Sequence, residues 1–359
     1  HTVGFIVPAS FGLVLSLNIL ALVIIGGLAS VHGPLIGSAI IVGLPFIFSR
    51  SFGGFLNIVV GALLIVFVLF FPRGLAYGLT LAKHRYLQRP GIAIRTAVKR
   101  RQSMAGNRVQ VDGVEIFYRE TGPANAAPLL YLHGNTGSSL WYERVMDIPG
   151  FRTIAPDMPN FGHSGHIPEA DIDRYADFVA GFIREMGLHP VPLVAHSLGG
   201  AVAHSLVSRN PELLSRLLLV DSAAPDGLVT PEEHYEAIEL YKTSRDLLRR
   251  GLAAVTPAMK DERFLDQLTD EALLMNPIAF AGNARALARI NYSKALGGFH
   301  GAVLVLLGTR DTIITRDMAE RTVAAYANAE LRLLEGIGHS VMVEDPQGFR
   351  RIVQEWAGT

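Results

Sequence analysis

The ten residues 191–200, VPLVAHSLGG, contain the feature that decides the fold. The apolar run Val191–Ala195 predicts a short buried strand, and a helical pattern follows Gly200. Ser197 lies between them, with a small residue two positions before it and two positions after it. A sharp strand-to-helix turn needs small residues at those positions and exposes the serine hydroxyl at the sheet edge. The segment therefore predicts a nucleophilic serine, although a serine in an ordinary tight turn would give the same pattern.

Strand and helix patterns alternate on both sides of this segment. Apolar runs predict strands at 108–111, 114–118, 128–132, 153–155, 191–195, 216–220, 302–307 and 331–334, and helical patterns cover 175–186 and 201–208. Strands joined by helices form a mostly parallel sheet that is covered on both faces. The fold class is therefore α/β, and the reactive groups are expected at the carboxyl ends of the strands.

A base and an acid follow Ser197 in the order that a serine nucleophile at such a turn requires, serine, then acid, then histidine. Asp311 comes shortly after the strand at 302–307, and His339 comes shortly after the strand at 331–334. His339 is predicted to be the general base and Asp311 the residue that orients it. Asp221, at the end of the strand at 216–220, is a second candidate for the acid, and the chain order favours Asp311.

Two backbone N–H groups are needed to bind the oxyanion that forms on a substrate carbonyl. The predicted donors are Leu198, directly after the nucleophile, and Asn135, in the loop after the strand at 128–132. His133 in the same loop is interpreted as a structural histidine. His163 and His166 have no third ligand nearby, so no metal site and no cofactor are predicted. The absence of cysteine excludes disulfides, thiolate metal sites and a catalytic cysteine.

As a set, these features resemble the α/β-hydrolase superfamily over residues 107–359. The matching elements are LHGN at 132–135, the turn at Ser197, GTRD at 308–311 and GH at 338–339. The turn DMPNFG at 157–162 is also similar, with Asn160 where the family has glycine. The resemblance implies a helical cap over the active site, at about 225–298, and helical patterns are expected at 231–252, 261–274 and 277–290.

Charge is distributed very unevenly along the 359 residues. The chain has 32 basic and 32 acidic residues, yet residues 1–72 contain one charge, Arg50. Residues 73–111 contain nine basic residues and no acidic one, which leaves 22 basic against 32 acidic residues in 112–359. The sequence therefore predicts three zones: an apolar segment, a basic linker at 81–106 and an acidic globular domain.

The apolar segment is too long for a secretory signal peptide. We predict about three transmembrane helices, at 5–27, 33–49 and 53–72, in a segment 1–80. Positive residues flanking a span mark the cytoplasmic side, so the globular domain is expected in the cytoplasm, with the basic linker against membrane lipids. Nucleic-acid binding is not expected, because the linker adjoins a span and has no recognisable nucleic-acid-binding fold.

Residues 3–80 resemble the C-terminal part of LivM-type branched-chain amino-acid ABC transporter permeases. The similar elements are GGLASVHGPLIGS at 26–38 and FPRGL at 71–75. Most of a permease is absent, and the chain begins at His1, which suggests a fragment or a processed product.

The sequence thus predicts a membrane-tethered serine hydrolase that cleaves an ester, lactone or thioester of a small molecule. One alternative is a permease fragment with an appended hydrolase-like domain, whose partners would include ABC transporter subunits. A third is a joint produced by gene fusion or sequence assembly, with no single function.

Overall fold

The computed structural model describes residues 106–358, which lie in the second of the two units, residues 105–359, into which the chain divides. The predicted spans and nearly all of the basic linker therefore lie outside the described residues. Within 106–358, no helix is both long enough and apolar enough to cross a bilayer.

Eight strands form one mixed sheet in the order β1-β2-β4-β3-β5-β6-β7-β8. The strands are β1 (Asn107–Val111), β2 (Val114–Thr121), β3 (Ala127–Leu132), β4 (Phe151–Pro156), β5 (Val191–His196), β6 (Leu214–Val220), β7 (Val303–Gly308) and β8 (Ala329–Leu334). Strand β2 pairs antiparallel with β1 and β4, and every pair from β4 to β8 is parallel. The predicted α/β class is confirmed, and the predicted strands agree with these within a few residues at each end.

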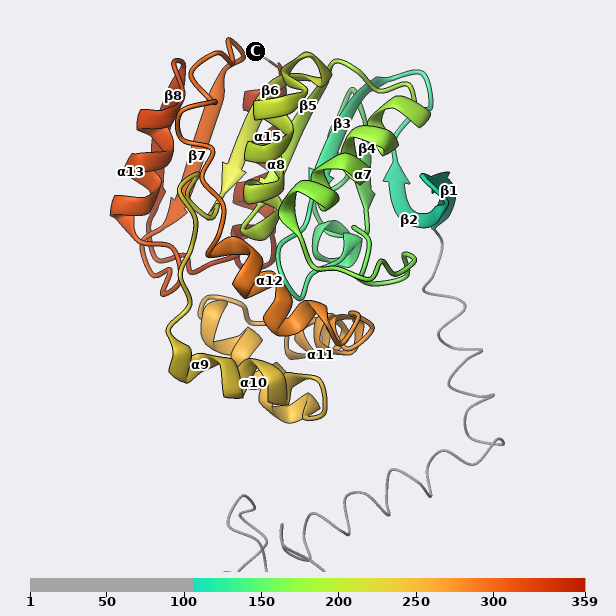
Figure 1. Ribbon diagram of the computed structural model, residues 1–359. Coiled ribbons are helices and arrows are strands. Elements are labelled where there is room, and N and C mark those ends of the chain that lie inside the picture. The colour runs from blue at the N-terminus through green and yellow to red at the C-terminus, as the bar shows by residue number, and fades with distance from the viewer. Residues whose placement is uncertain (1–105, 359) are drawn as a thin grey trace, which may run out of the picture. The chain divides into compact units, whose positions relative to one another are not determined.

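Helices cover both faces of the sheet, with α7, α8 and α13 in front of it and α15 behind it in Figure 1. The helices are α7 (Ile172–Glu185), α8 (Leu198–Arg209), α9 (Glu232–Tyr241), α10 (Arg245–Val255), α11 (Glu262–Ala272), α12 (Ala279–Leu287), α13 (Arg316–Ala325), α14 (Val341–Glu344) and α15 (Pro346–Gly358), with the 3₁₀ turns η4 (Ser139–Tyr142) and η5 (Pro211–Leu213). Helices α13, α14 and α15 and the turns η4 and η5 were not among the predicted elements.

The central strands contribute alternate residues to two hydrophobic cores. In β3, Leu130 and Leu132 belong to the core shared with α7 and α8, whereas Leu129 and Tyr131 belong to the core shared with η4 and α15. Successive side chains of a strand point to opposite faces, so a strand that is apolar throughout stabilises both layers. The uninterrupted apolar runs in the sequence follow from this two-sided burial.

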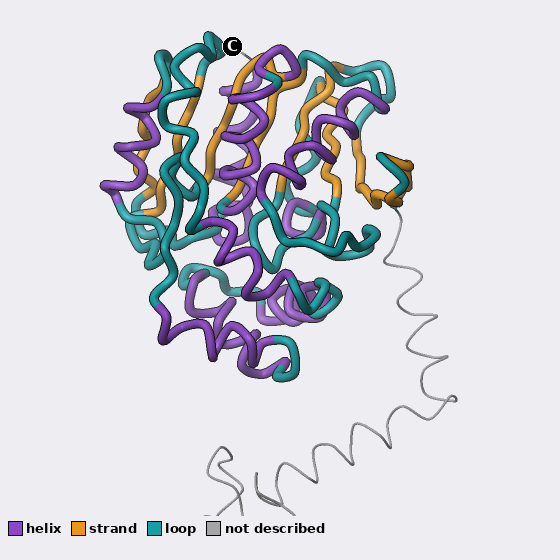
Figure 2. The backbone as a smooth tube through the Cα atoms, viewed as in Figure 1, coloured by secondary structure: helices purple, strands orange, loops and turns teal. Residues whose placement is uncertain are grey.

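The insertion between β6 and β7 is helical and contains α9, α10, α11 and α12. Figures 1 and 2 show these helices gathered beyond the carboxyl ends of the parallel strands. The helix predicted over 231–252 is wrong as a single element, because the chain breaks between α9 and α10. Ser244 causes the break: its hydroxyl accepts the N–H of Leu247 and caps a new helix.

Candidate active site

Ser197 lies at the sharp turn between β5 and α8. Its backbone has φ 53° and ψ −116°, a conformation that residues other than glycine rarely adopt. The turn brings α8 close to other backbone, since a Cβ atom on Gly199 would lie 2.6 Å from the carbonyl oxygen of His133. A Cβ on Gly200 would lie 2.0 Å from the hydroxyl of Ser222. These close contacts explain why positions 199 and 200 are glycines. The unusual backbone conformation of Ser197 costs about 1–3 kcal/mol, and such strain is concentrated at functional sites.

The structure brings together the three residues predicted for nucleophilic catalysis. His339 Nε2 lies 2.9 Å from the Ser197 hydroxyl, and His339 Nδ1 lies 2.8 Å from Asp311 Oδ2. The side chains of His339 and Asp311 are 7% and 1% exposed. Asp311 Oδ1 accepts the N–H groups of Ile313 and Ile314, which fixes the carboxylate plane. A hydroxyl, an imidazole and a carboxylate in this order can move a proton off the serine.

The electrostatic setting favours a charged pair of Asp311 and His339. Burial alone would raise the pKa of Asp311, but the hydrogen bond and the charge of His339 lower it. Burial alone would lower the pKa of His339, but Asp311 raises it above its ordinary value. The carboxylate therefore stabilises the imidazolium that forms when the serine loses its proton.

The backbone around His339 is held from three sides. Its N–H donates to the carbonyl of Val255 at the end of α10 (2.9 Å), and its carbonyl accepts from His196 Nε2 (2.8 Å). The Glu344 carboxylate accepts the N–H groups of the residues on both sides of His339, each at 3.0 Å. Burial lowers the pKa of His196 to about 3, so His196 is a neutral donor and not a second base. Neither Glu344 nor Val255 was predicted, because both contacts depend on how the chain folds back.

Asp221, the second candidate for the acid, is not hydrogen-bonded to His339. Its Oδ1 accepts the N–H of Gly308 at 2.8 Å, and its buried Oδ2 has no hydrogen-bond partner within residues 106–358. Burial raises the pKa of Asp221 well above its usual range, which favours the protonated form. Of the two candidate acids, Asp311 is therefore the one that is hydrogen-bonded to His339.

The loop of Asn135 and the start of α8 at Leu198, the two predicted oxyanion donors, both adjoin the turn at Ser197. A Cβ on Gly134, the residue before Asn135, would lie 2.9 Å from the Cβ of Ser197, so the loop after β3 touches the turn. Leu198 is the first residue of α8. Among the described residues, the backbone N–H groups of Asn135 and Leu198 have no hydrogen-bond acceptor. Two free donors beside a nucleophile suit a developing negative charge.

Three other histidines, His133, His163 and His166, lie in the loops that follow β3 and β4. His133 is buried and neutral, with Nε2 accepting the N–H of Met158, and burial lowers its pKa to about 4. His163 lies 3.1 Å from Glu271 of α11 and thus joins the cap to the core. His166 is exposed. No group of three metal-ligating side chains occurs in the part of the chain that is described.

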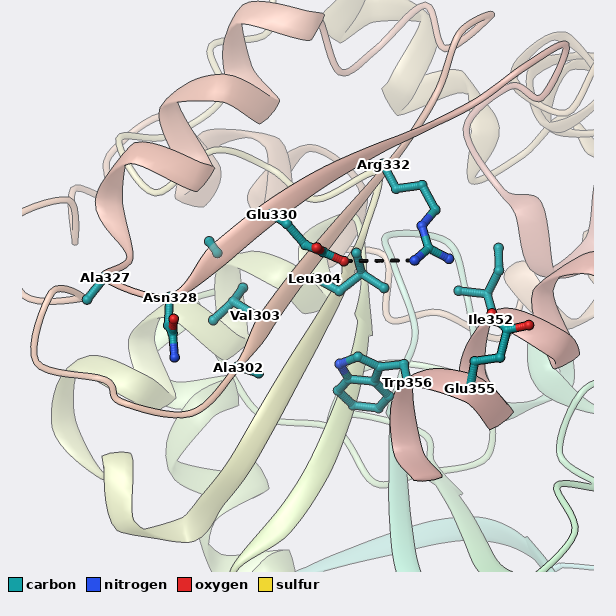
Figure 3. Close-up of a pocket in the computed structure, with 11 residues that line it drawn as sticks. Ala302, Val303, Leu304, Ala327, Asn328, Glu330, Arg332, Ile352, Glu355 and Trp356 are labelled. Atoms are coloured by element: carbon teal, nitrogen blue, oxygen red, sulfur yellow. Dashed lines mark ion pairs between the residues drawn. The ribbon is translucent and has the colours of Figure 1, made fainter. Parts of the chain in front are cut away.

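A surface cavity of about 520 Å³ lies away from these residues, between β7, β8 and α15. Figure 3 shows Trp356 and Ile352 of α15 facing the strand residues across it, with an ion pair between Arg332 and Glu330 (3.8 Å). The cavity shares no residue with the serine site.

The turn at Ser197, the histidine and acid after later strands, and the helical insertion after β6 define an α/β hydrolase. The chain belongs to the alpha/beta hydrolase family, whose model matches residues 129–352. The predicted permease-like segment lies outside this match.

Individual relatives agree with the enzyme class. The chain is 26% identical over 249 residues to the sn-1-specific diacylglycerol lipase ABHD11 of Mus musculus, covering 64% of this chain and 80% of the lipase. It is 27% identical over 271 residues to the non-heme chloroperoxidase CPO-A1 of Kitasatospora aureofaciens, covering 68% and 96%. The esterase EaEST from Exiguobacterium antarcticum has the same fold, with TM-score 0.63 and 20% identity over 71% of this chain and all of the esterase. The predicted class of enzyme, a serine hydrolase acting on ester bonds, is confirmed.

Proposed function

We propose that this protein cleaves an ester-type bond through Ser197, His339 and Asp311 while tethered to a membrane. The main support for ester cleavage is a chain of two hydrogen bonds, 2.9 Å and 2.8 Å long. It links the strained Ser197 through the imidazole of His339 to the buried carboxylate of Asp311. Leu198 directly follows the serine, the loop that carries Asn135 touches its turn, and among the described residues neither backbone N–H has an acceptor, so both could serve the substrate oxyanion.

The reaction follows from this geometry. The Ser197 oxygen bonds to the substrate carbonyl carbon as its proton passes to His339 Nε2, and the carbonyl oxygen becomes an oxyanion that accepts from Leu198 and Asn135. His339 then gives the proton to the leaving alcohol or thiol as the bond to it breaks, which leaves an acyl-serine. Water gives a proton to His339 and attacks the acyl group, and return of the proton to the serine releases the acid. Asp311 stays ionised throughout.

The nature of the acyl or alcohol group is open, with esters, lactones and thioesters all compatible. The name of the murine relative refers to diacylglycerol, a lipid ester. A domain tethered to a bilayer would meet such esters at its surface. The rate of hydrolysis of p-nitrophenyl esters of increasing acyl length would test this: a lipid-ester hydrolase should favour long chains, and a strict preference for acetate would contradict it.

Labelling with a fluorophosphonate tests the nucleophile. We expect the intact protein to be labelled and Ser197→Ala to lose both labelling and esterase activity. Ser215→Ala is the matched control, since Ser215 is an exposed serine at the start of β6 and should be labelled like the wild type. Equal labelling of Ser197→Ala and Ser215→Ala would refute the proposed mechanism.

The membrane tether rests on the sequence of residues 1–72, which contain a single charged residue, and on the basic strip that follows. A protein held by spans should stay in the membrane pellet after a wash at high pH with carbonate and should be released by detergent. Recovery in the carbonate supernatant would contradict the tether without affecting the proposed chemistry.

A further inference from the structure

A hydrogen-bonded pair of asparagines joins the loop after β3 to the cap. Asn283 of α12 donates from Nδ2 to the side-chain oxygen of Asn135, at 2.8 Å. Asn283 Oδ1 in turn accepts from the Tyr175 hydroxyl of α7, at 2.9 Å. Asn283 and Tyr175 are fully buried. The hydroxyl of Tyr175 thus fixes which side of the Asn283 amide faces Asn135.

The same network continues to the entrance of α12. Asn160, in the turn after β4, donates to the Glu169 carbonyl (2.9 Å) and lies 3.4 Å from the Tyr175 hydroxyl. Asn276 donates to Asn160 Oδ1 from its side chain (3.0 Å) and to the Asn160 carbonyl from its backbone (2.8 Å). Asn276, just before α12, and Asn283, within α12, are therefore both held to the core by polar contacts. Such a network holds one arrangement when every member has a partner.

The loop that carries Asn135 needs such support. Thr136 has φ 56°, so the backbone just after Asn135 is in a strained region. The turn is closed by one backbone hydrogen bond, from Gly137 to Gly134 (3.1 Å). Within residues 106–358, the hydrogen bonds of the Asn135 side chain go to Asn283 alone. Among these residues, the contact with the cap is therefore the one that holds the side chain of Asn135.

We propose that Asn283 is a positioning residue for the oxyanion site: the cap helix α12 aligns the N–H of Asn135 through the amide pair. This rests on the proposed function, because Asn135 is a donor only if Ser197 attacks a carbonyl. Asn283 touches no reacting atom. Its contribution is made in the transition state, where charge develops on the substrate oxygen, so its loss lowers kcat and leaves KM unchanged.

The test is a double-mutant cycle on the full chain with Asn283→Ala, Asn135→Ala and the double variant. Asn135→Ala keeps the backbone N–H and removes only the side chain that α12 holds. We expect each single variant to lose about 10- to 100-fold in kcat, less than or similar to the loss of a whole oxyanion donor. The double variant should lose no more than either single variant, because both remove the same contact.

Three further measurements separate alignment from general damage. The pH profile should be unchanged, since His339 and Asp311 are untouched. Asn328→Ala is the matched control, as Asn328 is an exposed asparagine between α13 and β8, and it should keep the wild-type kcat. If Asn283→Ala does not fold, Tyr175→Phe keeps the ring and removes the hydroxyl that orients Asn283, and a smaller loss of kcat is expected.

Additive losses in the double variant, or a lower Tm with wild-type kcat in Asn283→Ala, would overturn the proposal. Failure of the proposed function is a different result, because Ser197→Ala would then keep its activity whatever the cycle shows.

Discussion

At the scale of single residues, two aspartates with buried side chains, Asp221 and Asp311, lie near His339, and only Asp311 is hydrogen-bonded to it. Asp311→Asn keeps the size of the side chain but can present an N–H to His339, which favours the wrong tautomer. We expect kcat to fall by about 10³- to 10⁴-fold. Asp221→Asn is the matched control: it keeps an oxygen for the N–H of Gly308 and replaces a carboxyl whose neutral form is favoured, so activity should stay within a few-fold. Steady-state kinetics of both variants on a soluble ester test this assignment. A larger loss of kcat in Asp221→Asn than in Asp311→Asn would mean that Asp221 is the acid.

The pH profile depends on the same pair. A general base must be neutral to accept the serine proton, so kcat/KM should rise with pH as His339 loses its proton. Because Asp311 raises the pKa of His339, the midpoint should lie above about 6.5, the value of an isolated histidine. In Asp311→Asn this cause is absent, and the residual activity should have its midpoint at lower pH. A midpoint that does not move between the two proteins would contradict the assignment of Asp311.

At the scale of elements, the short helix α14 fixes the loop that carries His339. The Glu344 carboxylate accepts three backbone N–H groups, two beside His339 and one from Ala258 after α10. Glu344→Ala leaves these donors without their acceptor, at a cost of about 1–3 kcal/mol. We expect Tm to fall by several degrees and kcat to fall with it. Glu335→Ala, in the exposed turn after β8, should change neither. Scanning calorimetry and kinetics on both variants test this, and equal behaviour would show that α14 does not hold the loop.

The helices and strands also show which parts of the structure could be predicted from the sequence. The strands were predicted because two-sided burial makes them continuous apolar runs, as in Leu129–Leu132. Ser197, Asp311 and His339 could be predicted because each follows a strand that the pattern reveals. Asn283 and Glu344 were not found. Asn283 and Asn135 are 148 residues apart, and an asparagine within a helical pattern gives no sign of its partner. Contacts made by the cap become visible only in three dimensions.

At the scale of the whole molecule, the proposed topology puts the hydrolase domain, with 22 basic and 32 acidic residues in 112–359, on the cytoplasmic side of spans that contain no charged residue. The absence of cysteine allows a direct test, because the native chain has no thiol background. A cysteine introduced at Glu335, which is exposed, should resist a membrane-impermeant maleimide in intact cells and react after permeabilisation. The unmodified chain should stay unlabelled in both conditions. Labelling of Glu335→Cys in intact cells would place the hydrolase domain on the outer side of the membrane. The basic residues at 73–111 would then be an exception to the rule that positive residues beside a span lie on the cytoplasmic side.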